Sequence, residues 1–148
     1  MGTPAIAKIL DEEGKTIVSV FAQCDGFPED FGNEVIGCLR GRTVVNGLGA
    51  DTKLCSNGMT ELAAHVVVFL KTASPRGHIY LVPDKSTWAY EYLYVIAPPK
   101  IPGFYSGLCD MLDLTVYEAQ HPGNKDKKLF SGKVSGYDRF LQSYKAEV

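Results

Sequence analysis

The sequence lacks the features that direct a chain into a membrane or hold it together with disulfides. No apolar run approaches the roughly 18 residues of a membrane-spanning helix. Residues 1–5 carry neither the basic nor the apolar part of a secretory leader. The four cysteines, at positions 24, 38, 55 and 109, form no C-x-x-C pair. We therefore expect a reduced, intracellular protein that has unpaired thiols and no contact with membranes.

Motifs of the common catalytic and cofactor sites are missing as well. No G-x-S-x-G sequence is present to position a serine nucleophile. The Asn-Gly-Leu-Gly stretch at 46–49 lacks the third glycine of a dinucleotide fingerprint and the Gly-Lys-Ser/Thr of a phosphate loop, so we interpret it as a tight turn. The histidines and cysteines show no zinc-ligand spacing. These absences favour a non-enzymatic protein without cofactor or metal.

Neither sign of charge dominates the chain. Fifteen basic and 17 acidic residues give a net charge of −2, which provides no global attraction to nucleic acid. Lys125, Lys127 and Lys128 form the one compact basic run, which Asp126 interrupts. A solvated hairpin tip explains such a run, and a local nucleic-acid contact is the alternative.

What is present is a chain suited to one domain. Its 148 residues are 45% hydrophobic, which matches a single domain over residues 1–148 that buries about 68–70% of its unfolded surface. The first half predicts a β-hairpin from residues 5–10 and 15–23. Pro28 is suited to open a first helix, and Ser56 or Asn57 to cap a second, longer one.

The second half changes to the two-residue period of β-strands. We predict strands over residues 78–82, 87–97, 111–119 and 128–134, and then a short helix after Ser135. Without strict alternation of strands and helices, the order ββααβββ(β)α predicts an α+β domain. Its mainly antiparallel sheet includes the N-terminal hairpin and packs against two central helices.

The strand predicted over 87–97 places four aromatic residues on one face, namely Trp88, Tyr90, Tyr92 and Tyr94. Such a row is most often core packing or cross-strand stabilisation. If both long helices cover the opposite face of the sheet, the row would instead meet another subunit.

Several turn-forming blocks occur in a characteristic order. Their key positions are Asp25, Gly26, Pro28 and Gly32, then Asn46 and Gly47, then Asn57 and Gly58. Residues 77–83 and 90–94 complete the series. Together the blocks resemble a family of small proteins of bacteriophages, archaea and large DNA viruses, including viruses of amoebae. That family carries DGYPEG, NG-x-x-x-LAA, GGIYL-x-P and YEY-x-Y blocks, from which this chain departs at Gly77-His78 and Asp30-Phe31. The resemblance implies a viral setting and a fold, and no reaction.

Three carboxylates, Asp25, Glu29 and Asp30, gather where the first helix begins. One interpretation is acid–base chemistry or a hard cation. We favour the other, in which Asp25 shapes the turn and the remaining two interact with the helix dipole.

We therefore expect a non-enzymatic viral accessory or virion-packaged protein that acts through protein–protein contacts. It would form a homodimer through the aromatic row, or contact other viral or host proteins, in the host cytoplasm, the virion or the nucleus. The alternative is a nucleic-acid-binding or host-nucleus-directed viral factor that uses the lysine run. A third option is a hydrolase whose site combines the Asp25 and Asn46 turns.

Overall fold

A computed structural model describes residues 2–47, 54–73, 78–84, 88–120 and 124–146 of the chain. The first half contains β1 (Ala5–Leu10), β2 (Thr16–Ala22), the π-helical turn η1 (Pro28–Gly32), α1 (Asn33–Leu39), β3 (Thr43–Val45), β4 (Cys55–Asn57) and α2 (Gly58–Ala73). The second half contains β5 (Ile79–Leu81), β6 (Tyr92–Ala97), β7 (Gly107–Leu108), the 3-10 turn η2 (Cys109–Met111), β8 (Asp113–Glu118), β9 (Lys127–Lys133), the 3-10 turn η3 (Val134–Gly136) and α3 (Tyr137–Ala146).

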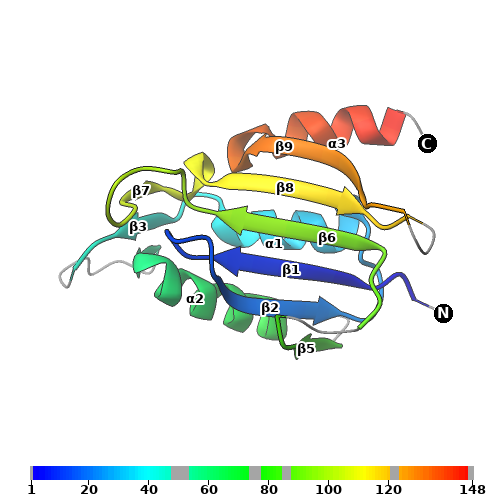
Figure 1. The fold of residues 1–148 in the computed structure, drawn as a ribbon, viewed down its shortest axis with the longest axis horizontal. Helices are drawn as coiled ribbons and strands as arrows, with labels where there is room; N and C mark the ends of the chain where they lie inside the picture. The colour runs from blue at the N-terminus through cyan, green and yellow to red at the C-terminus, as the bar shows by residue number, and fades with distance from the viewer. Residues whose placement is uncertain (1, 48–53, 74–77, 85–87, 121–123, 147–148) are drawn as a thin grey trace.

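Six strands form the central sheet, in the order β5-β2-β1-β6-β8-β9 (Figure 1). β1 lies in the interior, antiparallel to β2 and parallel to β6. The pairs β2–β5, β6–β8 and β8–β9 are antiparallel. A smaller sheet, β4-β3-β7, lies at one end of the molecule. The predicted α+β class with a mainly antiparallel sheet is confirmed, and the predictions missed the short strands β3, β4 and β7.

The N-terminal hairpin is confirmed, and its turn is set by one side chain. Asp11 Oδ1 accepts hydrogen bonds from the backbone N–H groups of Glu13 and Lys15, both at 2.9 Å. An aspartate that bonds the backbone in this way stabilises a local turn. Gly14, with φ of 80°, then returns the chain into β2.

The predicted helix at Pro28 is confirmed with a modified first turn. Residues 28–32 form the π-helical turn η1, and α1 continues from it. The apolar side chains at Phe31, Val35, Cys38 and Leu39, which lie on one side of this helical segment, are all buried. α2 likewise buries Met59, Leu62, Ala63, Val66 and Leu70. No helix among the described residues is both long and apolar enough to cross a membrane.

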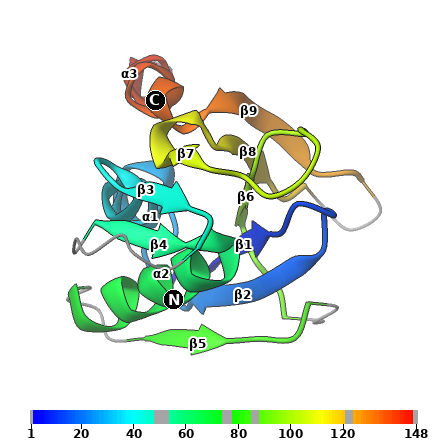
Figure 2. The same ribbon diagram turned by 90° about the vertical axis from the view of Figure 1, so that its left-hand side faces the viewer.

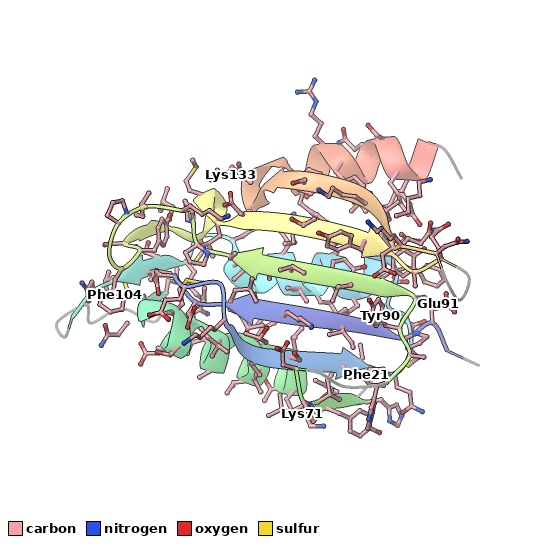
Figure 3. All side chains as sticks on the ribbon, in the orientation of Figure 1. Phe21, Lys71, Tyr90, Glu91, Phe104 and Lys133 are labelled. Atoms are coloured by element: carbon pink, nitrogen blue, oxygen red, sulfur yellow. The ribbon has the colours of Figure 1, made fainter. Side chains whose placement is uncertain are left out.

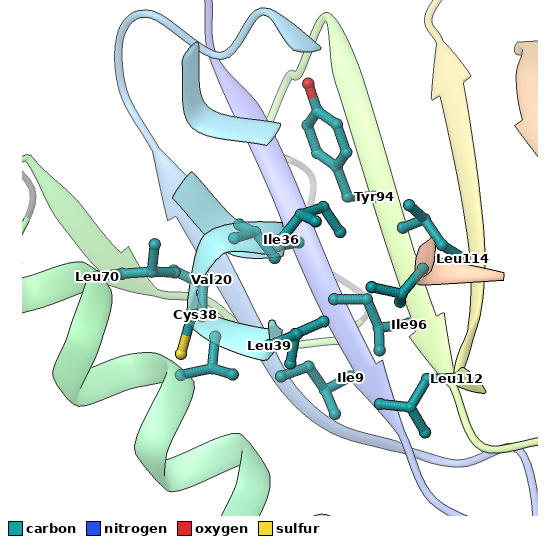
Figure 4. Close-up of a cluster of buried hydrophobic side chains, with 14 of the residues drawn as sticks. Ile9, Val20, Ile36, Cys38, Leu39, Leu70, Tyr94, Ile96, Leu112 and Leu114 are labelled. Carbon is teal, nitrogen blue, oxygen red and sulfur yellow. The ribbon is translucent and has the colours of Figure 1, made fainter. Parts of the chain in front are cut away.

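The helices cover one face of the central sheet (Figure 2). Between them and the sheet lies the main core, to which β1 contributes Ala5, Ala7 and Ile9. Figure 4 shows Ile36 and Leu39 of α1 packed over Ile9 and Ile96 of β1 and β6. The opposite face of the sheet carries no helix in either view. We call this second surface the open face.

Candidate interaction surface

The predicted aromatic row does not exist as one surface. β6 begins only at Tyr92, so Trp88 and Tyr90 precede the strand. Tyr92 and Tyr94 point to the helices and are 5% and 1% exposed. Trp88 and Tyr90 lie on the open face instead, where Trp88 packs edge-on against Phe21 at a centroid distance of 4.8 Å. The prediction that all four residues share one interface is therefore wrong.

Tyr92 and Tyr94 tolerate burial because their hydroxyl groups have partners. Tyr94 donates a 2.7 Å hydrogen bond to the carbonyl oxygen of Gly26. The Tyr92 hydroxyl lies 2.9 Å from that of Tyr144 and donates to Glu118 Oε2 at 3.3 Å. Burial raises the pKa of both tyrosines above the usual value, so both remain neutral hydrogen-bond donors at physiological pH.

An apolar row does cross the open face. In β6 it contains Leu93, which lies in the sequence between the predicted residues Tyr92 and Tyr94. Strand pairing places five side chains side by side across five strands: Tyr80, Phe21, Ile6, Leu93 and Tyr117. Cross-strand neighbours on one face are close enough to pack. The next row carries Ser19, Lys8, Val95 and Thr115, in the same strand order from β2 to β8.

The connection from β5 to β6 covers one half of this face. Val82 donates its N–H to the carbonyl oxygen of Ser19 at 3.0 Å, and Lys8 forms an ion pair with Asp84 at 3.1 Å. Val82 and Tyr90 pack on Ile6 and Phe21, which are 4% and 8% exposed. Figure 3 shows Phe21 and Tyr90 near the same end of the sheet.

The other half of the face stays accessible. Leu93, Val95 and Tyr117 are half-buried, and Leu93 packs at the edge of the cluster formed by Ile6, Phe21 and Val82. Tyr90 packs with Leu93 against the same cluster, whereas Trp88, 48% exposed, lies against Phe21 and Tyr80 on the covered half. The four residues Tyr90, Leu93, Val95 and Tyr117 are called the open-face patch below. Its rim carries both signs of charge, as in the 2.6 Å ion pair between Lys133 and Asp113.

The predicted basic run is exposed. Lys127 and Lys128 begin β9, Lys125 lies two residues before it, and all three side chains are exposed. Asp126 lies between these lysines in the sequence, and its Oδ2 atom accepts a 2.7 Å hydrogen bond from the Tyr90 hydroxyl. Burial, with the bond to Asp126, raises the pKa of Tyr90 to about 12.

The turns of the sequence blocks form hydrogen bonds that hold neighbouring elements together. Asn57 Oδ1 accepts a 2.9 Å hydrogen bond from the N–H of Gly47, which joins the second block to the third. The Asn57 N–H donates to Glu61 Oε1 at 2.7 Å, an arrangement that satisfies a backbone donor where α2 begins. The remainder of the 46–49 turn lies outside the described residues. At the first block, Asp25 adopts φ of 56° and Gly26 donates to the carbonyl oxygen of Thr3 at 2.7 Å.

These positions contradict the hydrolase option. The Asp25 turn follows β2 and the Asn46 turn follows β3, and the two strand ends lie at opposite ends of the molecule (Figure 1). No single site can therefore contain both turns. Among the described residues, no group of three or more histidine, cysteine, aspartate or glutamate side chains is arranged to hold a metal ion.

One serine–histidine contact is present that sequence reasoning did not find. Ser56 Oγ lies 2.7 Å from His65 Nδ1, and Arg42 Nη1 lies 3.2 Å from the same nitrogen. Arg42 can only donate, so Nδ1 is the acceptor in that contact. Ser56 is completely buried, so its hydroxyl cannot reach a substrate. The cluster therefore links His65 of α2 to Ser56 of β4 and to Arg42, immediately before β3. The spacing of these three residues in the sequence did not indicate that they would meet.

None of the four cysteines forms a disulfide. Cys38 and Cys109 are buried, whereas Cys24 and Cys55 are half-buried. Burial raises the pKa of Cys38, and it raises that of Cys109 to about 12. Neither buried thiol is thus an activated nucleophile.

No protein-family model, curated protein or solved structure matches this chain.

Proposed function

We propose that this protein is non-enzymatic and acts through protein–protein contacts, as a homodimer that joins the open faces of two subunits. One observation carries the proposal: on the open face, the half that the β5–β6 connection does not cover retains a contiguous apolar patch around Leu93, Val95 and Tyr117. Contiguous exposed apolar surface marks interaction sites more often than isolated apolar residues do.

A second copy is the occupant that the chemistry of the patch favours. Tyrosine suits an interface because it combines an apolar body with a polar tip, and the patch contains two tyrosines, Tyr90 and Tyr117. Its rim has both a lysine and an aspartate, Lys133 and Asp113. In a two-fold arrangement each patch meets its own copy, so a rim with both signs can be self-complementary.

The resemblance to viral proteins gives this contact its setting. A viral accessory or virion-packaged protein, in host cytoplasm, nucleus or particle, would use the patch for itself or for another viral or host protein. Presence of the chain in purified particles would support the packaged role. Early expression without packaging would count against it.

Light scattering on the purified protein tests the dimer. We expect about twice the 16.2 kDa chain mass, and Val95→Lys should restore the monomer mass because it places a charge in the centre of the contact. The matched control is Val68→Lys, which changes a 59% exposed valine on the outer side of α2 and should leave the dimer intact. A wild-type monomer at high micromolar concentration would refute the proposal, as would a dimer unaffected by Val95→Lys.

The lysine run supports a second candidate, a nucleic-acid contact. Its three lysines are exposed, and the intervening Asp126 is bonded to Tyr90. If they bind phosphates, changing Lys125, Lys127 and Lys128 to glutamine should weaken DNA or RNA binding and reduce its dependence on salt. Unchanged mobility-shift titrations for the triple variant would exclude this candidate.

A further inference from the structure

A small cavity lies on the helix side of the molecule, away from the open-face patch. Its volume is about 220 Å³, and it is lined by Phe27, Glu29, Tyr144 and Lys145. The first two come from the Asp25–Gly32 block at η1, and the last two from the end of α3. The cavity therefore joins the first motif of the chain to its last helix.

Glu29 provides the unusual feature of this cavity. Its Oε2 atom is buried and has no hydrogen-bond partner. The buried hydroxyl groups nearby are already committed, since Tyr94 donates to the carbonyl oxygen of Gly26 and Tyr137 to that of Pro28. Burial raises the pKa of Tyr137, and the negative charge of the Glu29 carboxylate raises it further. A buried carboxylate oxygen without a donor is costly, so it favours a ligand that supplies one.

The walls beside Glu29 are aromatic and held in place. The Phe27 ring packs against Tyr92 at a centroid distance of 5.8 Å, and the Tyr144 ring packs against Phe140 at 5.7 Å. The contact between the Tyr92 and Tyr144 hydroxyl groups, at 2.9 Å, connects the two walls. Faces of aromatic rings attract cations.

We propose that this cavity binds an organic cation, an ammonium or guanidinium group, whose N–H donors pair with Glu29 between Phe27 and Tyr144. Charge-assisted bonds to a carboxylate are the stronger class of hydrogen bond. The volume is below the roughly 300–1,000 Å³ of a pocket for drug-sized ligands, so the ligand has the size of one amino-acid side chain. It is either a free amine or a lysine or arginine side chain of a partner protein.

Lys145 acts as a competitor for the same carboxylate. Its side chain is exposed and lines the cavity, and within the described part of the chain it forms no ion pair with Glu29. Its positive charge opposes an entering cation. Removal of that charge should therefore tighten cation binding, whereas a purely structural role of Glu29 predicts no such effect.

Titration by NMR, with n-butylammonium and methylguanidinium as free probes and the neutral methylurea as isosteric control, tests the proposal. We expect saturable shifts of the Phe27 and Tyr144 ring signals with a cation and none with methylurea. Glu29→Gln should weaken binding at least about tenfold, since a charge-assisted pair is lost. Lys145→Gln should tighten it about threefold or more by removing a like charge.

Asp30→Asn is the matched control, because Asp30 lies in the same turn and does not line the cavity. It should change the affinity less than twofold. A capped glycine pentapeptide with one central arginine separates the two sources: binding at least as tight as that of methylguanidinium indicates a partner side chain, and weaker binding indicates a free amine. Equal shifts with methylurea, an equal loss in Asp30→Asn, or no saturable shift with either cation would overturn the proposal.

Discussion

The hydroxyl of Tyr94, in the middle of β6, donates a 2.7 Å hydrogen bond to the backbone carbonyl oxygen of Gly26. The two residues belong to different sequence blocks, 68 positions apart. The contact explains why a tyrosine only 1% exposed can lie in the main core, because its polar tip is satisfied by a fixed backbone acceptor. It also fixes the turn that leads into η1, and thus one wall of the cavity at Glu29.

Tyr94→Phe should destabilise the protein by about 1–3 kcal/mol, because it leaves the buried carbonyl oxygen of Gly26 without its donor. Urea unfolding followed by circular dichroism measures this loss. Tyr117→Phe, in which a half-buried ring of the open face loses its hydroxyl, is the control and should cost less than about 0.5 kcal/mol. Equal losses in the two variants would contradict the assigned role of the Tyr94 bond.

Gly32→Ala should destabilise by about 1–3 kcal/mol, because the site is overpacked. A Cβ atom at Gly32 would meet the hydroxyl of Tyr137 and lie 2.8 Å from Cε1 of Tyr94. Gly37→Ala is the matched control: it also lies in this helical segment, its Cβ would meet nothing within 4 Å, and alanine should stabilise α1 by about 0.5–1 kcal/mol. If both substitutions changed the free energy of unfolding in the same direction, the packing of Tyr94 and Tyr137 over Gly32 would be wrong.

Stability should fall in alkali through the buried tyrosines. Burial raises the pKa of Tyr92, Tyr94 and Tyr137 in the folded protein, whereas an unfolded tyrosine has a pKa of about 10. Above about pH 10 the unfolded state therefore binds fewer protons than the folded state, so the free energy of unfolding decreases as pH rises. Tyr137→Phe should reduce this decrease, as measured by urea unfolding at about pH 9 and 11. An unchanged pH dependence in the variant would contradict the prediction.

The four cysteines should differ in reactivity, two of them reacting slowly and two quickly. Cys38 and Cys109 are buried and their pKa values are raised by that burial, so a disulfide reagent at neutral pH should label them slowly. The half-buried Cys24 and Cys55 should react first. In denaturant without reductant, all four thiols should react with the reagent. A blocked pair would show that a disulfide forms, and fast labelling of all four in the native protein would contradict the burial.

Local patterns in the sequence were sufficient for the hairpin, α2 and the paired strands β8 and β9, because each depends on periodicity and turn chemistry within a short segment. The alternation of β6 also correctly grouped Tyr92, Tyr94 and Ile96 on one face, and all three are buried. What the alternation could not give was the residue at which the strand begins. Trp88 and Tyr90 continue the pattern along the chain, yet they belong to the connection that passes over the open face.

The sequence by itself thus determined the longer elements and the alternation of faces along them, since both follow from local spacing. Only the tertiary structure decided which face of the sheet the helices cover, and that choice placed Tyr92 and Tyr94 in the core and left Leu93, Val95 and Tyr117 accessible. It also brought Glu29 next to Tyr144, and Ser56 next to His65. Such contacts depend on the packing of whole elements against one another, which no pattern within a single segment specifies.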